Sequence, residues 1–227
     1  MNTSIADNIA RVRAQMAAAC QSAGRAPGSV QLLAVSKTWS AEAVRTAHAA
    51  GQTDFGENYI QEAVDKITCL RDLPLVWHCI GPIQSNKTRL VAEHFDWVHS
   101  IDRLKIAQRL SEQRPEHLPP LQVCIQVNVD GGETKSGVSP QDLPALAQAV
   151  ATLPRLRLRG LMTIPEPAET DAQMRTVHRQ SKDLFEQLRA QGLPLDTLSM
   201  GMSADMAAAI AEGSTLVRVG TAIFGQR

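Results

Sequence analysis

The sequence has few cysteines, and their spacing does not suggest a functional group. Its four cysteines, Cys20, Cys69, Cys79 and Cys124, form no C-x-x-C pair, which argues against a zinc site or a disulfide framework. The six histidines also lack metal-ligand spacing. We therefore expect no bound metal, cysteines that serve as small buried apolar residues, and a cytoplasmic location.

Net charge and long apolar segments are also missing. The 23 basic residues balance the 23 acidic ones without a basic cluster, so nucleic acid is not an expected partner. No apolar run approaches the roughly 20 residues that span a bilayer, so no membrane segment is expected. At 227 residues and 44% hydrophobic, the chain can build one large core, and we expect a single domain over 1–227.

Short apolar runs alternate along the chain with longer alanine-rich amphipathic stretches, after an opening helix. The predicted strands are 31–36, 53–55, 75–80, 97–99, 121–127, 157–161, 197–198 and 215–219. The predicted helices between them are 41–50, 59–70, 85–94, 103–113, 140–152, 171–191 and 204–212. Such alternation requires parallel strands with right-handed crossovers. Eight units of this length predict a (β/α)8 TIM barrel with an extra N-terminal helix. A doubly wound open sheet is the alternative, because the second, fourth and seventh strands are weakly defined.

Residues at several helix boundaries support these limits. Ser40, Asp102 and Ser203 stand where helix N-caps are expected. Gly51 and Gly192 suit the positions that follow helix ends.

Lys37 is the first chemically unusual residue, because it directly follows an apolar strand. By strand alternation it shares a face with Leu33 and Val35. Apolar surroundings lower the pKa of an amine and increase its nucleophilic, neutral fraction, as a Schiff-base lysine requires. The alternative is a lysine that leaves the strand for solvent or a salt bridge.

Arg218 is the second unusual residue, because it stands between Val217 and Val219 in the last strand. A guanidinium keeps its charge, and an unpaired buried charge is costly. Arg218 must therefore meet an anion or a hydrogen-bond acceptor. An ion pair with a carboxylate of the chain is the alternative to a role in ligand binding.

The loops after the last two strands have the composition of a phosphate site. Gly220 and Thr221 follow the eighth strand, and 199–203 follows the seventh and leads into a predicted helix. Loops at these positions often bind phosphate in (β/α)8 barrels, through backbone N–H groups and hydroxyls. With Lys37 and Arg218, these loops favour one ligand that has an aldehyde, a phosphate and a ring, namely pyridoxal 5′-phosphate (PLP).

The same segments resemble the pyridoxal-phosphate homeostasis protein family, a relative of the barrel domain of alanine racemase, over nearly the whole chain. The matching motifs are AVSKT at 34–38, FGENY at 55–59, HCIGPIQSNK at 78–87, LRGLM at 158–162, LSMGMS at 198–203 and VRVGTAIFG at 217–225. The sequence ends at 226–227 without the basic tail that some similar proteins carry, so a contribution of such a tail to cofactor release is not expected.

The resemblance implies a role for each candidate residue. Lys37 carries the cofactor as a Schiff base, Arg218 faces the pyridine nitrogen and Asn58 lines the ring. The phosphate is bound by Ser203, Gly220 and Thr221. The family is thought to store PLP and deliver it to apo-enzymes through transient contacts, and we expect a monomer or a weak dimer.

We expect no strong catalysis from this chain, for two reasons. An arginine beside the ring nitrogen keeps that nitrogen unprotonated and limits carbanion stabilisation. Racemisation also needs acid–base groups on both faces of the substrate carbon, and the one tyrosine, Tyr59, offers no obvious second base. The alternatives are a broad-specificity PLP-dependent amino-acid racemase and a barrel lyase that uses Lys37 on a phosphorylated sugar.

Overall fold

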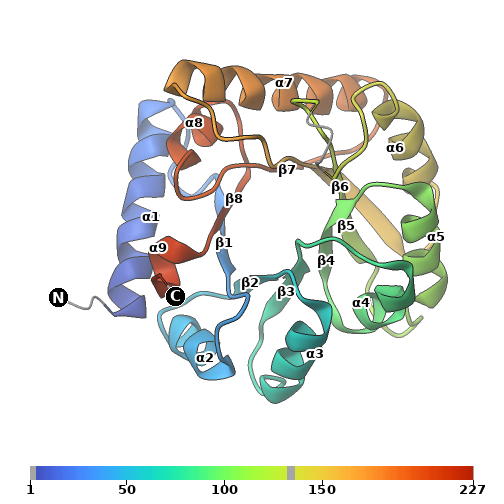
Figure 1. Ribbon diagram of the computed structural model, residues 1–227, viewed down its shortest axis with the longest axis horizontal. Helices are drawn as coiled ribbons and strands as arrows, with labels where there is room; N and C mark the ends of the chain where they lie inside the picture. The colour runs from blue at the N-terminus through green and yellow to red at the C-terminus, as the bar shows by residue number, and fades with distance from the viewer. Residues whose placement is uncertain (1–3, 132–135, 227) are drawn as a thin grey trace.

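The protein is a closed barrel of eight parallel strands in sequential order, surrounded by helices (Figure 1). The structure is a computed structural model that describes residues 4–131 and 136–226. The first strand pairs with both the second and the eighth strand, so the sheet has no free edge. The barrel expected from the sequence is confirmed, and the open-sheet alternative was wrong.

All eight predicted strands are present, with boundaries shifted by one or two residues. They are β1 (Gln31–Val35), β2 (Asp54–Glu57), β3 (Val76–Cys79), β4 (Trp97–Ile101), β5 (Leu121–Gln126), β6 (Leu156–Met162), β7 (Thr197–Ser199) and β8 (Leu216–Val219).

The helices cover the outside of the barrel and include one that the sequence analysis did not predict. They are α1 (Ile5–Ser22), α2 (Ala41–Ala49), α3 (Ile60–Cys69), α4 (Thr88–His94), α5 (Leu104–Gln113), α6 (Leu143–Ala151), α7 (Asp171–Ala190), α8 (Met206–Ala211) and α9 (Thr221–Phe224), with a 3-10 turn, η1 (Ser85–Lys87), before α4. The opening helix α1 buries Ile9, Val12 and Met16, which lie on one face at helical spacing. The unpredicted helix is α9, which begins directly after Gly220.

The boundary residues were predicted in part. Ser40 caps α2 by accepting from the Ala43 amide, and Gly51 and Gly192 follow their helices with positive φ. Two cap predictions were wrong. α5 begins at Leu104, so its N-cap is Arg103 and not Asp102, and α8 begins at Met206 and not at residue 204.

Strand alternation divides the barrel residues between two layers. Leu32 and Ala34 belong to the large cluster between strands and helices, whereas Leu33 packs with Ile80 and Leu216 in a separate small cluster. Successive side chains of a strand point to opposite faces, so the small cluster lies inside the barrel. Residues that alternate with members of the large cluster along a strand therefore point into the barrel.

The cysteines mostly behave as small apolar residues. Cys20, Cys79 and Cys124 are buried, and burial raises the pKa of Cys79 and Cys124 to about 12. The prediction was wrong for Cys69, which is exposed at the end of α3. Among the described residues, no group of His, Cys, Asp and Glu side chains is arranged to hold a metal ion. None of the helices in the described ranges combines the length and apolarity that a membrane crossing requires.

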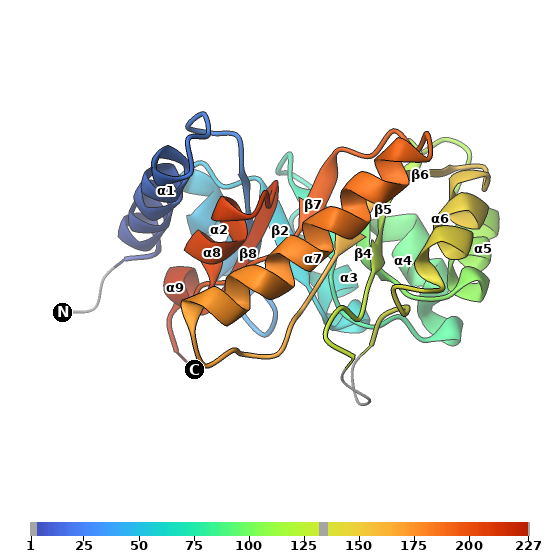
Figure 2. The same ribbon diagram turned by 90° about the horizontal axis from the view of Figure 1, so that it is seen from above.

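The first helix packs against the last two on one side of the barrel (Figures 1 and 2). The buried Asn8 side chain of α1 donates a 2.8 Å hydrogen bond to the carbonyl oxygen of Ile223 in α9. The extra N-terminal helix is thus joined to the segment that follows β8.

Candidate functional site

The structure places Lys37 beside the turn that follows β8. Lys37 follows β1 at the carboxyl end of the barrel and is partly buried. It lines an open cavity of about 450 Å³ together with Val35, Trp39, Gly220 and Thr221. Three of the six candidate residues, Lys37, Gly220 and Thr221, therefore border the same space.

The backbone turn that carries Lys37 is strained and is fixed from α3. Thr38 has φ 64°, a left-handed conformation that a β-branched residue rarely adopts. Its amide donates a 2.6 Å hydrogen bond to Oε1 of Glu62. The next residue, Trp39, stacks on Phe224 of α9 with 5.7 Å between ring centroids. These contacts set the direction in which the chain leaves β1.

A buried ion pair lies behind this turn, between the barrel and α3. Lys66 Nζ donates to Glu57 Oε1 at 2.6 Å and to the Ser36 carbonyl oxygen at 2.9 Å. The Ser36 hydroxyl also donates to Glu57 Oε1, at 2.6 Å. The Glu57 side chain is fully buried, and burial raises the pKa of its carboxyl despite the nearby ammonium. The sequence analysis did not identify this pair, which anchors the residue directly before Lys37.

Arg218 lies inside the barrel and donates to two neutral oxygens. Its Nη1 donates to Ser199 Oγ at 2.8 Å and its Nη2 to the Thr163 carbonyl oxygen at 2.9 Å. Burial lowers the pKa of Arg218 to about 10, so the guanidinium remains charged near neutral pH. In the described part of the chain, Arg218 therefore donates to neutral oxygens and does not form the ion pair with a carboxylate that was the alternative in the sequence analysis.

Asn58 is positioned like Lys37 on the neighbouring strand. Val35 and Gly56 are partners in the β1–β2 register, and Lys37 and Asn58 each lie two residues further on. Asn58 does not cap the following helix, because the N-cap of α3 is Tyr59, without a side-chain hydrogen bond. Within the described ranges, Asn58 Oδ1 is buried and has no hydrogen-bond partner. A buried unpaired amide oxygen is unfavourable, so Asn58 suits contact with a ligand donor.

Gly220 and Thr221 form the start of α9, where backbone donors are available. The first N–H groups of a helix have no partner within the helix, and these groups adjoin the cavity that Lys37 lines. A β-carbon at Gly220 would lie 3.3 Å from the carbonyl oxygen of Val35, so glycine permits close packing of β8 on β1. The segment can therefore present amide donors and the Thr221 hydroxyl to an anion.

The structure places Ser203 away from the cavity that Lys37, Gly220 and Thr221 border. Ser203 is exposed in the turn before α8 and lines another cavity, with residues of α1 and α7. The role of N-cap belongs to Asp205, whose Oδ1 accepts from the Met202 amide at 2.7 Å and whose Oδ2 lies 2.9 Å from His178 Nε2. The structure thus does not bring Ser203 to the cavity of Lys37, and its role in binding phosphate remains a prediction.

The fold and the site define a barrel of the type found in alanine racemases. The family model described as "Alanine racemase, N-terminal domain" matches residues 4–227. The alanine racemase of Corynebacterium glutamicum has the same fold, with a TM-score of 0.70 at 23% identity over 96% of this chain and 59% of that one.

Sequence similarity over the full length of the chain identifies a family within this class. The pyridoxal phosphate homeostasis protein of Pseudomonas aeruginosa is 66% identical over 226 residues, which cover 99% of this chain and 96% of that protein. The protein of the same name from Escherichia coli K12 is 56% identical over 98% of this chain and 97% of that protein. The chain belongs to the pyridoxal phosphate homeostasis protein family.

A solved structure that resembles this chain over its whole length contains PLP. PipY of Synechococcus elongatus PCC7942, with PLP bound, is 41% identical and superposes with a TM-score of 0.86 over 98% of this chain and all of that one. Its form without PLP gives a TM-score of 0.88 at 42% identity.

Proposed function

We propose that this protein binds PLP as a Schiff base on Lys37 and serves in PLP homeostasis, by storing the cofactor and delivering it to apo-enzymes. One observation carries this proposal: the same cavity is bordered by Lys37 and by the start of α9, where backbone N–H groups and the Thr221 hydroxyl can donate. An amine and an anion-binding helix start are the two groups that an aldehyde with a phosphate tail requires.

The remaining residues fit the same ligand. Asn58 would line the ring, since its Oδ1 is buried without a partner in the described chain. Arg218 would face the pyridine nitrogen, and Gly220 and Thr221 would hold the phosphate. The part proposed for Ser203 in phosphate binding rests on the family resemblance alone, because Ser203 lines another cavity. When bound, PLP supplies an electrophilic carbon and a conjugated ring.

Storage is favoured over catalysis by the state of Arg218. With a pKa of about 10, its guanidinium is a hydrogen-bond donor at neutral pH and would leave the ring nitrogen unprotonated. An unprotonated ring stabilises a carbanion poorly. We further place the protein in the cytoplasm, as a monomer or weak dimer that meets apo-enzymes transiently. These assignments rest on the sequence alone.

The direct test of binding is the absorption spectrum of the purified protein before and after borohydride reduction. We expect a visible band that reduction removes, with the reduced cofactor on the peptide containing Lys37. Lys37→Ala should lack the band, and Lys105→Ala, which removes an exposed lysine of α5, should retain it. Label on another lysine would refute the assignment.

Storage is tested by mixing the loaded protein with a PLP-dependent apo-enzyme. Reconstitution should depend on Lys37 and exceed that with the same concentration of free PLP. Equal rates of reconstitution with the loaded protein and with free PLP would refute delivery and leave storage as the proposed role. Inversion of free amino acids by the purified protein would instead identify a racemase.

A further inference from the structure

A continuous chain of hydrogen bonds leads from Arg218 through the barrel interior to the opposite end. Arg218 Nη1 donates to Ser199 Oγ at 2.8 Å, and Ser199 Oγ lies 2.8 Å from His99 Nδ1. His99 Nε2 lies 2.9 Å from His78 Nδ1, and His78 Nε2 lies 3.0 Å from Asp54 Oδ1. The side chains come from β8, β7, β4, β3 and β2, and they lie on the interior faces of these strands.

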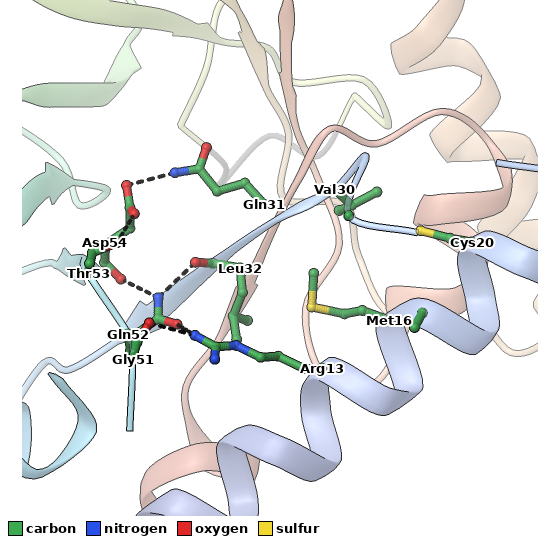
Figure 3. Close-up of a pocket in the computed structure, with 12 residues that line it drawn as sticks. Arg13, Met16, Cys20, Val30, Gln31, Leu32, Gly51, Gln52, Thr53 and Asp54 are labelled. Carbon is green, nitrogen blue, oxygen red and sulfur yellow. Dashed lines mark hydrogen bonds between the residues drawn. The ribbon is translucent and has the colours of Figure 1, made fainter. Parts of the chain in front are cut away.

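The chain joins a buried cation to a carboxylate near solvent. Ser199, His99 and His78 are fully buried, whereas the Asp54 side chain is 16% exposed. Asp54 borders a cavity of about 370 Å³ at the amino ends of β1 and β2, where it accepts a 2.7 Å hydrogen bond from Gln31 (Figure 3). The interactions of Arg218 therefore extend to the far end of the barrel.

The two ends determine the direction of the hydrogen bonds. Arginine can only donate and an ionised carboxylate can only accept. Burial acts to raise the pKa of Asp54, but the hydrogen bonds from His78, Thr53 and Gln31 together lower the carboxyl pKa below its usual value. An ionised Asp54 accepts from His78 Nε2, so an imidazole ring with a single proton at this position has Nδ1 left to accept from His99.

The same reasoning fixes the remaining links. Burial, with the positive charge of Arg218, lowers the pKa of His99 well below its usual value, so His99 is neutral. His99 then donates from Nε2 to His78 and accepts at Nδ1 from the Ser199 hydroxyl. Every donor points from Arg218 towards Asp54, and hydrogen bonds aligned in this way polarise and strengthen one another.

We propose that His99 and His78 are positioning residues that hold Arg218, through Ser199, in the orientation that meets the ring nitrogen of the cofactor. The inference rests on the proposed binding of PLP. The Ser199 hydroxyl donates its proton to His99, and this hydrogen bond directs a lone pair of the Ser199 oxygen towards Arg218. Loss of His99 releases the hydroxyl to rotate and weakens the contact that orients the guanidinium.

The first experiment examines the hydrogen bonds without the cofactor. In ¹⁵N NMR spectra of the cofactor-free protein at about pH 8, above the usual histidine pKa, the ring proton of both His78 and His99 should lie on Nε2. Ser199→Ala should shift the Nδ1 resonance of His99. A proton on Nδ1 of His99 would overturn the proposed direction of the chain.

The second experiment is a double-mutant cycle on the PLP dissociation constant. His99→Phe and Ser199→Ala should each weaken binding about tenfold in the wild-type background, the size expected for one hydrogen bond to a charged group. Neither should weaken it further in the Arg218→Ala background, because a positioning residue acts through its partner. The band of the bound cofactor should shift only in the wild-type background. Equal losses in both backgrounds, or no loss in either, would overturn the proposal.

Controls separate this result from loss of fold and from failure of the proposed function. His94→Phe, on α4 and outside the chain of hydrogen bonds, should bind PLP as the wild type does. Thermal unfolding shows whether each variant is folded. If His99→Phe does not fold, the double-mutant cycle with Ser199→Ala tests the proposal. If the wild type itself binds no PLP, the proposed function fails, and the NMR experiment still decides the direction of the chain.

Discussion

The carboxylate of Glu62 accepts a 2.6 Å hydrogen bond from the backbone amide of Thr38. Glu62 lies in the first turn of α3 and Thr38 follows Lys37, so a residue of the neighbouring βα unit fixes the turn after β1. Thr38 has a left-handed conformation there. The hydrogen bond helps to hold a strained turn at the site where PLP is proposed to bind, as is common for backbone strain in proteins.

Replacement of Thr38 by glycine should stabilise the protein. Left-handed φ costs an L-residue about 1–2 kcal/mol, whereas the extra freedom of glycine in the unfolded chain costs about 0.5–1 kcal/mol. We expect the free energy of unfolding in urea to rise by about 0.5–1 kcal/mol. Thr46→Gly, at an exposed position in α2, is the matched control and should destabilise by a few tenths. A loss as large as that of the control would contradict the prediction.

The Lys66–Glu57 pair should be costly to break and much cheaper to remove entirely. Lys66→Met leaves the buried Glu57 carboxylate without its cation, and such changes destabilise by about 3–5 kcal/mol. The double variant with Glu57→Met should recover most of that loss, because two apolar side chains leave no buried charge unpaired and Glu62, the other partner of Lys66, is partly exposed. Urea unfolding measures both. Lys105→Met, exposed on α5, should stay within about 0.5 kcal/mol of the wild type.

Asp205 should make the stability of the protein sensitive to acid. Burial acts to raise its pKa, but the hydrogen bond from His178 and that from the Met202 amide lower it below the usual value. A carboxyl with a lower pKa in the folded state stabilises the fold above its unfolded pKa, and this contribution is lost as the pH falls through the folded pKa. The free energy of unfolding should fall below about pH 5, less steeply for Asp205→Asn. Identical slopes for the two proteins would refute this role.

Asn58 should matter for the cofactor more than for the fold. In the described chain its Oδ1 has no partner to lose, so Asn58→Ala should change the free energy of unfolding of the cofactor-free protein by less than about 0.5 kcal/mol. Loss of a contact to the ring should weaken PLP binding by about tenfold. Titration of the cofactor-free protein with PLP measures the second effect. A variant that is destabilised but binds normally would show Asn58 to be structural.

The fold could be predicted because each strand is a short apolar run with a helix-forming segment after it. Errors arose where polar residues are buried or elements are short. Glu57 belongs to β2 although it is charged, because Lys66 neutralises it from α3, and no local pattern shows that partnership. The helix α9 has only four residues, too few for an apolar period. The helix α8 begins two residues later than predicted, and its N-cap, Asp205, makes no side-chain hydrogen bond to the helix.

The sequence could predict contacts between the ends of neighbouring strands, but it could not predict contacts across the barrel interior. Lys37, Gly220 and Thr221 meet because β1 and β8 are neighbours in any closed barrel. His99 and Ser199 are 100 residues apart and come from β4 and β7. Alternation indicates that His99 points inward, since Val98 beside it packs outward. Its partner depends on the dimensions of the barrel, which the sequence alone does not give.

The hydrogen bond from Asn8 to Ile223 joins residues 215 positions apart, and β1 also depends on β8 to complete its pairing. While the chain emerges from the ribosome, α1 is made first, but Ile223 is not yet synthesised. Contacts between such distant segments form late and slow folding. Closure of the barrel, and with it assembly of the PLP pocket, must therefore wait for the last residues of β8 and α9. Nascent chains that lack them should expose strand edges to chaperones and proteases.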